Sequence, residues 1–427
     1  MVVDRETLEF IHLSDGTKSF RQIVKLLARE KDTSARLLLR NTRLVLKELK
    51  KAHLVGQRQI VPSLALVDPI LENITLNATR KCNLKCIHCF LDDSISVPES
   101  LSISNLKRFL KEGQQYLSPN LNFVILGGEP LLNKAKTLEI AELGKNRRCE
   151  VIVSTNGILV DSAFARKASE MDLVVQVSME GSIPELNDEI RGANSFSKAK
   201  KGVKLLVEHN VYTILCQVVQ KANFHDIESF YNFAVALGVN EVRFIPLKLM
   251  GRARSLEFGP VAQKDLLHAI HRILMRYPEA KNYLKRDFLA IMRTICARSN
   301  KRAYCGTGLK TILIDADGEV YPCPNHAVQE FRCGNISETN FRDIWLKAPI
   351  LRRIREAYHI DTINQECPIC PVKYWCMGGC RGETYENTGT LNSKATNCED
   401  IKRAIIEMFW ILSTGEFRLL SERTEFF

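Results

Sequence analysis

Long hydrophobic runs are absent from this chain of 427 residues. No uninterrupted apolar segment approaches the roughly 20 residues that a membrane-spanning helix needs. The first 20 residues contain Asp4, Arg5, Glu6 and Glu9 and lack the apolar core of a secretion signal. Internal repeats and low-complexity tracts are also absent. We therefore expect a cytoplasmic protein that does not enter a membrane and is long enough for two or three domains, each with its own core.

Cysteine, in contrast, is abundant, with 14 residues in the chain. In a small secreted protein this number would indicate a disulfide scaffold. Here three cysteines form the pattern Cys82-x3-Cys86-x2-Cys89, and seven more recur near the C-terminus. Thiolates at the first spacing can hold one iron–sulfur cubane from a short loop, and three ligands for four irons leave one iron open to another molecule. Zinc and disulfide interpretations also exist for such short clusters.

Three further motifs stand where strand-like runs end. Residues 127–130 read Gly-Gly-Glu-Pro, residues 154–157 read Ser-Thr-Asn-Gly, and residues 177–181 read Val-Ser-Met-Glu-Gly, followed by Arg191. Glycines let the backbone approach a ligand closely, and a carboxylate can pair with a cationic amine. Each segment alone is more often an ordinary turn. Their shared position at strand ends indicates a common binding site.

Strand-like and helical segments alternate through the middle of the chain. We expect strands at 72–76, 123–126, 151–154, 173–178, 212–219 and 241–245, and intervening helices that include 104–116, 196–209 and 226–237. This alternation predicts parallel βαβ units, whose ligands lie beyond the carboxyl ends of the strands.

Together these motifs resemble the radical SAM enzymes, over about residues 73 to 400. The resemblance implies a partial (β/α)6 barrel, and a cluster whose free iron is chelated by S-adenosylmethionine. A reduced cluster of this kind cleaves the cofactor to a 5′-deoxyadenosyl radical. The residues that the resemblance assigns to S-adenosylmethionine are Gly127, Gly128, Glu129, Ser154, Asn156, Ser178, Arg191 and His88.

The C-terminal cysteines resemble the seven-cysteine SPASM pattern, which binds two auxiliary iron–sulfur clusters. The resemblance assigns Cys305, Cys323 and Cys380 to the first auxiliary cluster, and Cys367, Cys370, Cys376 and Cys398 to the second. Three clusters of the [4Fe–4S] type are therefore expected in all. The first auxiliary cluster has three assigned ligands. Its fourth ligand is Cys296, Cys333 or a substrate thiolate, or the fourth position is empty. A zinc site built on Cys367-x2-Cys370 is the alternative.

The expected fold class is α/β, with a small domain on each side of the barrel. The predicted divisions are 1–62, winged-helix-like; 70–250, radical SAM partial barrel; 251–304, helical bridge; 305–400, SPASM domain; and 401–427, a C-terminal helix.

The N-terminal division is predicted to hold helices at 4–13, 19–30 and 35–52 and a strand at 54–61, after which residues 63–68 form an extended linker. The second of these helices is expected to start at the cap Ser19 and to carry an apolar stripe of Phe20, Ile23, Val24, Leu26 and Leu27. Residues 1–60 contain 13 Lys and Arg against 7 Asp and Glu, or +6 of the chain's net +11. Such a surface attracts polyanions or acidic peptides.

The region around residues 13–27 resembles the peptide-recognition domain related to the pyrroloquinoline quinone chaperone (PqqD-like), truncated before its first helix. A small domain that merely packs on the barrel is the alternative. No base-reading set stands out on the third helix, so nucleic acid is not an expected partner.

This combination of domains resembles the maturases of ribosomally made peptides. The resemblance implies an enzyme that installs a thioether or carbon–carbon cross-link in a leader-bearing precursor peptide, with an electron donor such as flavodoxin or ferredoxin. Alternatives are a sulfatase maturase and a tetrapyrrole side-chain modifier. Sulfatase maturases carry an aspartate base after the second SPASM cysteine, where this chain has Pro324. An alternative of another class is a redox-sensing, winged-helix, nucleic-acid-binding protein.

Overall fold

The computed structural model describes Leu13, 18–30, Ser34, Leu38, 69–91, 98–257, 259–285 and 304–413. The chain divides into two compact units. One comprises residues 1–65, 292–300 and 406–427, and the other comprises 66–291 and 301–405. The second unit contains every cysteine of the two predicted patterns.

A nine-stranded sheet organises the larger unit, in the order β6-β5-β4-β3-β2-β1-β7-β8-β9. Strands β6 to β1 and β7 pair in parallel, and β8 and β9 continue the sheet antiparallel. The strands are β1 (Leu71–Asn77), β2 (Leu117–Leu126), β3 (Glu150–Thr155), β4 (Val174–Ser178), β5 (Tyr212–Val219), β6 (Glu241–Pro246), β7 (Thr311–Ile314), β8 (Glu319–Tyr321) and β9 (Gly334–Asn335). All six predicted strands are confirmed, although β2 begins six residues earlier than expected.

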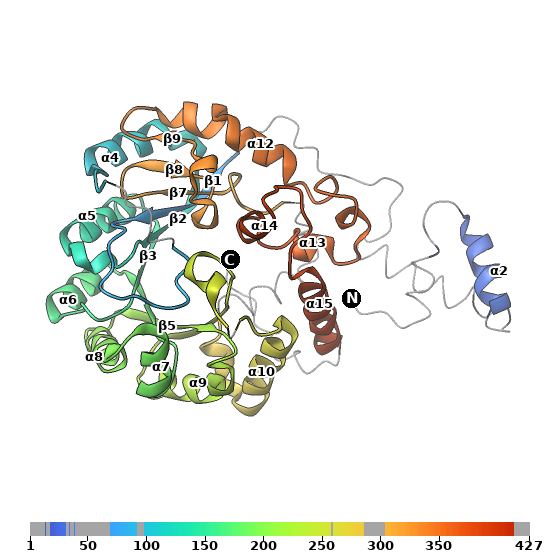
Figure 1. Ribbon diagram of the computed structural model, residues 1–427, viewed down its shortest axis with the longest axis horizontal. Helices are drawn as coiled ribbons and strands as arrows, with labels where there is room; N and C mark the ends of the chain where they lie inside the picture. Colours follow the sequence, from blue (N-terminus) through green and yellow to red (C-terminus); the bar gives the residue numbers. More distant parts are fainter. Residues whose placement is uncertain are drawn as a thin grey trace. The chain divides into compact units, whose positions relative to one another are not determined.

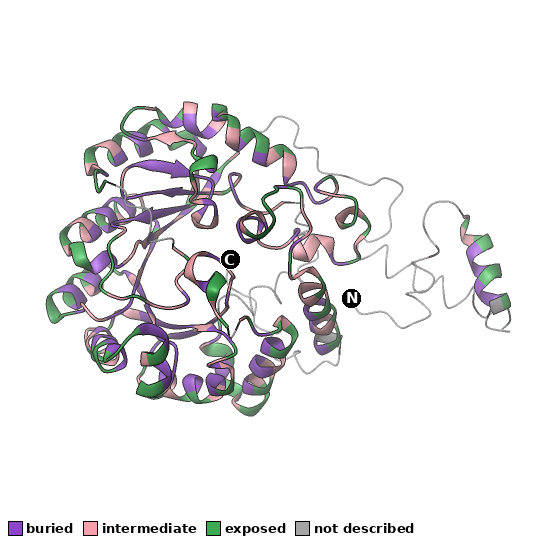
Figure 2. Ribbon diagram, viewed as in Figure 1, coloured by how far each residue is buried: buried purple, intermediate pink, exposed green. Residues whose placement is uncertain are grey.

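Helices flank the parallel strands on their outer side, with buried faces turned toward the sheet and exposed faces turned away (Figures 1 and 2). They are α4 (Ile103–Glu112), α5 (Lys134–Lys145), α6 (Ser162–Glu170), α7 (Pro184–Arg191), α8 (Ser195–Glu208) and α9 (Ile227–Ala236), with short 3-10 turns η1 (Gln114–Tyr116), η2 (Pro130–Asn133) and η3 (Phe224–Asp226). The predicted helix 104–116 is divided at Gly113, which ends α4. Because β-branched residues such as Val153 and Val175 are fully buried, the central strands have apolar contacts on their covered faces.

After β6 the chain passes through η4 (Gly251–Ser255), α10 (Gln263–Arg276) and η5 (Pro278–Asn282). These elements agree with the helical bridge predicted over 251–304, as far as residue 285. Residues 286–303, including Cys296, lie outside the described part of the chain.

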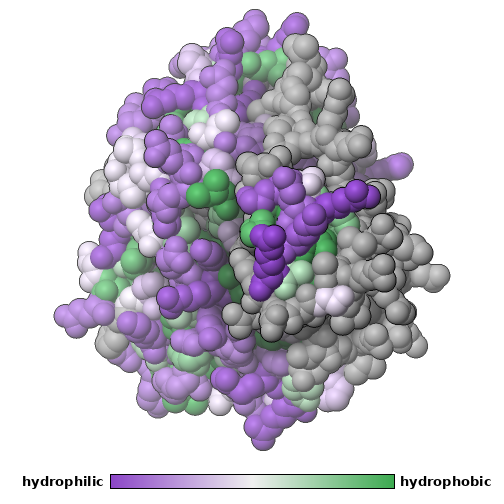
Figure 3. All heavy atoms as spheres, turned by 90° about the vertical axis from the view of Figure 1, so that its right-hand side faces the viewer, coloured by the Kyte–Doolittle hydropathy of each residue, from purple (hydrophilic) through white to green (hydrophobic). Residues whose placement is uncertain are grey.

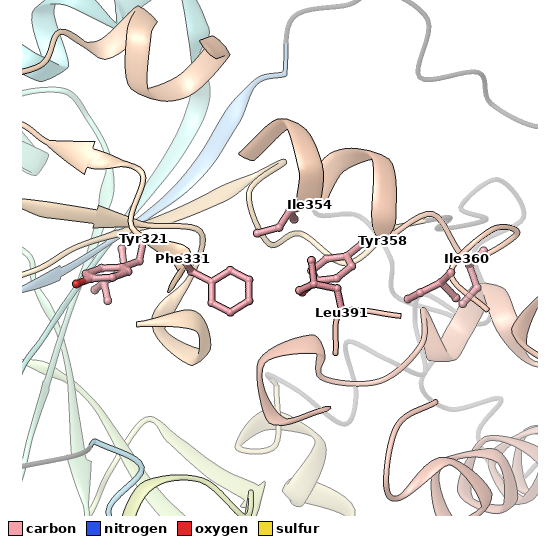
Figure 4. Close-up of a cluster of buried hydrophobic side chains, with 8 residues drawn as sticks. Tyr321, Phe331, Ile354, Tyr358, Ile360 and Leu391 are labelled. Atoms are coloured by element: carbon pink, nitrogen blue, oxygen red, sulfur yellow. The ribbon is translucent and has the colours of Figure 1, made fainter. Parts of the chain in front are cut away.

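The C-terminal region of the larger unit is built on β7, β8 and β9 and on short helices. These are η6 (Pro324–His326), η7 (Gln329–Phe331), the π-helical turn η8 (Asp343–Lys347), α12 (Pro349–Ala357), η9 (Cys367–Ile369), α13 (Lys373–Cys376), α14 (Arg381–Thr388) and α15 (Cys398–Ser413), of which residues 398–405 belong to this unit. Its core is a row of buried side chains from β8 through α12 to the segment after α14 (Figure 4); the cluster comprises Leu313, Tyr321, Phe331, Ile354, Tyr358, Ile360, Ile363 and Leu391. A helix was predicted over 401–427. The observed helix, α15, begins at Cys398, and residues 414–427 lie outside the described part of the chain.

In the smaller unit the predicted helix 19–30 is confirmed as α2 (Phe20–Glu30). The backbone N–H of Ser19 donates to Gln22 Oε1 at 2.7 Å, which is one half of a capping box. Ile23, Val24 and Leu27 are buried with Leu38, whereas Leu26, placed on the same stripe from the sequence, is 37 % exposed. The predicted elements 4–13, 35–52 and 54–61 and the linker 63–68 fall on residues that are not described, apart from Leu13 and Leu38.

None of the helices in the described ranges is both long and apolar enough to cross a membrane. Figure 3 shows a face of the molecule where hydrophilic residues predominate and hydrophobic ones form only small groups.

Candidate functional site

The three cysteines of the first motif lie on the loop that follows β1, residues 78–91, here called the cluster loop. All three line a cavity of about 600 Å³ at the carboxyl ends of the parallel strands. Ser154, Ser178 and Arg191, from the ends of β3, β4 and α7, line the same cavity. The structure thus brings the cysteine motif and the predicted cofactor motifs to one place, as expected for parallel strands.

Two glycines fix the cluster loop against the end of β2. The Gly128 N–H donates to the Thr79 carbonyl at 2.9 Å, and the Glu129 N–H donates to the Lys81 carbonyl at 2.8 Å. A Cβ atom on Gly127 would lie 2.1 Å from the Thr79 oxygen, and one on Gly128 would lie 2.2 Å from the Lys81 oxygen. Only glycine permits this approach, so one function of the motif is to seat the loop that carries Cys82.

The Glu129 carboxylate lies behind the cavity wall and does not line it. It is fully buried and accepts hydrogen bonds from Thr155 Oγ1 at 2.6 Å, the Asn156 N–H at 2.7 Å and the Leu131 N–H at 3.0 Å. Burial raises the pKa of this carboxyl group, although these hydrogen bonds act in the opposite direction. In this arrangement Glu129 ties the ends of β2 and β3 together.

Asn156 connects β3 to the cluster loop. Its Nδ2 donates to Asn83 Oδ1 at 2.7 Å, next to Cys82. Ser154 Oγ accepts from Gln176 Nε2 at 3.2 Å. Ser154 and Asn156, at the end of β3, both line the cavity, and hydrogen bonds to neighbouring residues orient their side chains.

A buried carboxylate organises the opposite wall. Glu180 accepts from Arg191 Nη2 at 2.6 Å and Nε at 3.1 Å, and from the Val218 N–H at 2.8 Å. His88 Nε2 lies 3.2 Å from the same carboxylate, and Arg191 Nη1 is 3.9 Å from Cys86 Sγ. Burial opposes the ionisation of Glu180, but His88 and Arg191 outweigh it and lower its pKa. The sequence motif contained Glu180 without assigning it a function.

Burial raises the pKa of the Cys82 and Cys86 thiols, although Arg191 acts in the opposite sense on Cys86. Because a metal binds the thiolate form, binding there would release protons.

The first auxiliary set, Cys305, Cys323 and Cys380, is brought together around polar side chains. Thr307 Oγ1 is 3.3 Å from Cys305 Sγ and donates to Cys323 Sγ at 3.4 Å. Asn325 Nδ2 donates to Cys380 Sγ at 3.2 Å.

His326 also contacts this set, with Nδ1 3.2 Å from Cys323 Sγ and Nε2 2.8 Å from the Tyr358 hydroxyl. Burial lowers the pKa of His326 to about 3, so its imidazole is neutral at pH 7.

The second auxiliary set lines a separate cavity of about 240 Å³. Its four members all face that space, and they are Cys367, Cys370, Cys376 and Cys398. Among the described residues, no three His, Cys, Asp or Glu side chains converge closely enough to hold a single metal ion. The thiols of a four-iron cluster each bind a different iron, so cavities lined by several thiols fit a cluster.

The remaining cysteines occupy other environments. Cys333 Sγ donates to the Phe331 carbonyl at 3.4 Å, and burial raises the pKa of its thiol to about 12. Cys149 and Cys216 are buried, and Cys216 also lines the large cavity.

Two residues of the cavity lining were not predicted as site residues from the sequence. Arg80, on the cluster loop, donates from Nε to Asp315 Oδ2 at 2.8 Å, and Asp315 directly follows β7. Lys248, just after β6, lines the cavity, and its ammonium group interacts electrostatically with Cys380. Each depends on a contact between distant parts of the chain, and a basic residue in a loop gives no local signal of such a contact.

Comparison with protein families adds a second line of argument. Residues 76–234 match the radical SAM superfamily, and residues 305–371 match the SPASM iron–sulfur cluster-binding domain. The chain is a radical SAM enzyme with a SPASM domain. Its two domains imply S-adenosylmethionine and iron–sulfur clusters as cofactors, in agreement with the thiol sets and the cavity described above.

Several characterised proteins resemble this radical SAM enzyme. AdoMet-dependent heme synthase of Methanosarcina barkeri is 28 % identical, over 76 % of this chain and 95 % of the relative. The antilisterial bacteriocin subtilosin biosynthesis protein AlbA of Bacillus subtilis is 27 % identical, over 73 % and 67 %. Mycofactocin maturase MftC of Mycobacterium ulcerans is 28 % identical, over 72 % and 82 %.

Two solved structures share the fold. The structure of anSMEcpe with bound AdoMet superposes with a TM-score of 0.66 at 22 % identity, covering 80 % of this chain and 98 % of that one. Streptococcus suis SuiB bound to its precursor peptide SuiA gives 0.61 at 16 % identity, covering 93 % and 94 %.

Proposed function

We propose that this enzyme installs a cross-link, a thioether or a carbon–carbon bond, in a ribosomally made precursor peptide. The observation that carries the proposal is the position of the large cavity between two thiol sets. Cys82, Cys86 and Cys89 line it directly, and Asn325 lines it while donating to Cys380. A substrate in the cavity therefore lies next to both sets.

A reduced iron–sulfur cluster held by Cys82, Cys86 and Cys89 would supply the electron for the cleavage of S-adenosylmethionine, and so the radical that takes one hydrogen atom from the substrate. The chain's own residues position the reactants. The Arg191–Glu180 pair fixes one wall, Asn156 fixes the cluster loop, and the buried strands behind them exclude water. Forming the cross-link would release a second electron and a proton, and a cluster held by Cys305, Cys323 and Cys380 would be placed to accept that electron. The product then has two hydrogens fewer than the substrate.

The contacts to S-adenosylmethionine belong to the same proposal. Gly127, Gly128, Ser154, Asn156, Ser178 and Arg191 line the cavity and remain candidates for direct contact, as does His88. Glu129 acts through the backbone that it orders. We propose three four-iron clusters, held by the ten cysteines of the two patterns.

A peptide substrate is supported by the names of two relatives, a maturase and a bacteriocin biosynthesis protein. Residues 1–62 would recognise the leader of that peptide, and a flavodoxin or ferredoxin would supply the electron. Deleting residues 1–60 should leave S-adenosylmethionine cleavage intact and reduce turnover of a leader-bearing peptide. Equal turnover with and without these residues would contradict leader recognition and favour a domain that only packs on the barrel.

The decisive experiment is an anaerobic reaction of iron-reconstituted enzyme with S-adenosylmethionine, a reductant and the short peptides encoded beside its gene. Mass spectrometry should find a loss of two hydrogens from one peptide together with 5′-deoxyadenosine. Formation of 5′-deoxyadenosine with every peptide unchanged would contradict a peptide substrate.

A tetrapyrrole with carboxylate side chains is the second candidate. The cavity lining includes the cationic residues Lys81, Lys85, Lys248 and Arg252, which suit carboxylates, and one relative is a heme synthase. Adding a propionate-bearing metalloporphyrin to the same assay separates the two candidates by which compound changes mass. A sulfatase maturase is disfavoured because Pro324, which begins η6, has no side chain that accepts a proton.

A further inference from the structure

Lys248 and Asn325 occupy an unusual place, since both line the large cavity and both contact one cluster ligand. The Asn325 amide nitrogen is 3.2 Å from Cys380 Sγ, and the Lys248 ammonium lies near enough to interact electrostatically with the same sulfur. Both contacts lie within the larger compact unit.

The backbone around Lys248 is held firmly from both sides. The Leu249 N–H donates to Glu383 Oε1 at 3.1 Å and the Gly251 N–H donates to Glu386 Oε1 at 2.9 Å, both on α14, which follows Cys380. On the other side the Arg252 N–H donates to the Cys89 carbonyl at 3.0 Å. The lysine is therefore fixed between the first cluster loop and the helix that begins beside Cys380.

Hydrogen bonds to the cysteine sulfurs and nearby positive charge stabilise the reduced, more negative state of an iron–sulfur cluster. A donor amide and an ammonium on one sulfur act in the same direction. The second auxiliary set differs, because the lysine beside Cys398 is Lys394, which is half-buried and forms ion pairs with Glu366 and Glu399. Two carboxylates beside an ammonium offset much of the effect of its charge on a nearby sulfur.

We propose that Lys248 and Asn325 are positioning residues that raise the reduction potential of the cluster bound by Cys305, Cys323 and Cys380. This makes it the better electron acceptor of the two auxiliary clusters. The inference rests on the assignment of Cys380 to a cluster, and it is independent of which substrate the enzyme modifies.

The test is an anaerobic redox titration followed by electron paramagnetic resonance, using the full chain with Cys82, Cys86 and Cys89 replaced by Ala. Only the auxiliary clusters then contribute, and the signal lost in a Cys323→Ala variant identifies the cluster in question. In Lys248→Met the equilibrium constant for its reduction should fall about tenfold, which is about 59 mV for a one-electron couple. Asn325→Asp should shift the potential in the same direction, because it replaces the donor with a carboxylate.

Controls separate tuning from general damage. Lys248→Arg keeps the charge and should stay near the unmodified potential. Lys145→Met removes a lysine that lies far from Lys248 in the sequence and pairs with Asp172. This change should leave the reduction potentials of both auxiliary clusters unaltered. The second auxiliary cluster should keep its potential in every variant.

Unchanged potentials in both Lys248→Met and Asn325→Asp, with full iron content, would overturn the proposal. Loss of iron from both variants would also overturn it, since the two side chains would then hold the cluster rather than tune it. Absence of iron from the parent chain would instead count against the cluster assignment, so the two failures are distinguishable.

Discussion

Asp315, the first residue after β7, accepts a hydrogen bond from Arg80, two residues before the proposed cluster ligand Cys82. Asp315 also accepts from Asn77 Nδ2 at 2.9 Å, at the end of β1. Because β7 belongs to the SPASM region and pairs in parallel with β1, this carboxylate fixes the cluster loop from the neighbouring domain.

Replacing Asp315 by Ala should therefore affect the first cluster, although Asp315 is no ligand. The change leaves the Arg80 guanidinium, whose side chain is 13 % exposed, without its carboxylate. We expect a loss of roughly 3 kcal/mol in unfolding free energy and a lower iron content at the Cys82 site. Denaturant unfolding and iron analysis measure the two effects.

The matched control is Glu72→Gln. This change removes the exposed ion pair between Glu72, on β1, and Lys310, which directly precedes β7. That change should cost less than about 1 kcal/mol. Equal effects of the two substitutions would show that Asp315 has no special part in holding the loop.

The cluster loop itself gives the second prediction. Replacing Cys82, Cys86 and Cys89 together by Ala should abolish 5′-deoxyadenosine formation, because no site remains for the cluster that cleaves the cofactor. Roughly eight irons should remain, from two four-iron auxiliary clusters. Liquid chromatography and iron analysis test this, and undiminished cleavage would refute the assignment.

The third prediction concerns Glu180. Glu180→Gln removes the charge that balances Arg191 in a fully buried position, so S-adenosylmethionine binding should weaken by at least tenfold and the fold should lose about 3 kcal/mol or more. Equilibrium binding and unfolding curves report the two effects. Glu185→Gln, on the exposed start of α7, serves as the control, and it should change neither quantity.

The fourth prediction concerns alkaline stability. Tyr231 is buried, its hydroxyl has no hydrogen-bond partner among the described residues, and burial raises its pKa to about 12. Between pH 10 and pH 12 the folded protein keeps a proton that the unfolded chain has lost. Stability therefore falls as pH rises, by up to about 1.4 kcal/mol per pH unit for this group.

Tyr231→Phe removes this titration, so the variant should lose stability less steeply than the parent between pH 10 and pH 12. Tyr304 and Tyr321 also have pKa values raised to about 12, so part of the slope should persist. Urea unfolding at several pH values measures it. Parallel curves for the variant and the parent would contradict the buried titration.

Much of the larger unit was readable from the sequence because its signals are local. Buried parallel strands are short apolar runs, and all six predicted strands formed and pair in parallel. The predicted motif residues collected at the strand ends for the same reason. In the smaller unit the stripe on α2 was correct for Ile23, Val24 and Leu27 and wrong for Leu26, whose exposure depends on what packs against the helix.

Contacts between distant segments could not be read in this way. Nothing local indicates that β7 continues the sheet beside β1, because strand pairing depends on the whole chain's topology. The position of Glu129 behind the wall likewise follows from its bonds to Thr155 and Asn156, on another strand.

The sequence by itself determined the chemistry of this protein, because cluster ligation depends on residue type and on spacing within a short loop or pattern. The tertiary structure alone decided how the parts act on one another. It placed Glu180 against Arg191, Asp315 against Arg80, and Lys248 and Asn325 against Cys380. These pairings join residues far apart in the chain, and they follow from a fold in which the strand ends and the first thiol set line one cavity, to which Asn325 connects Cys380.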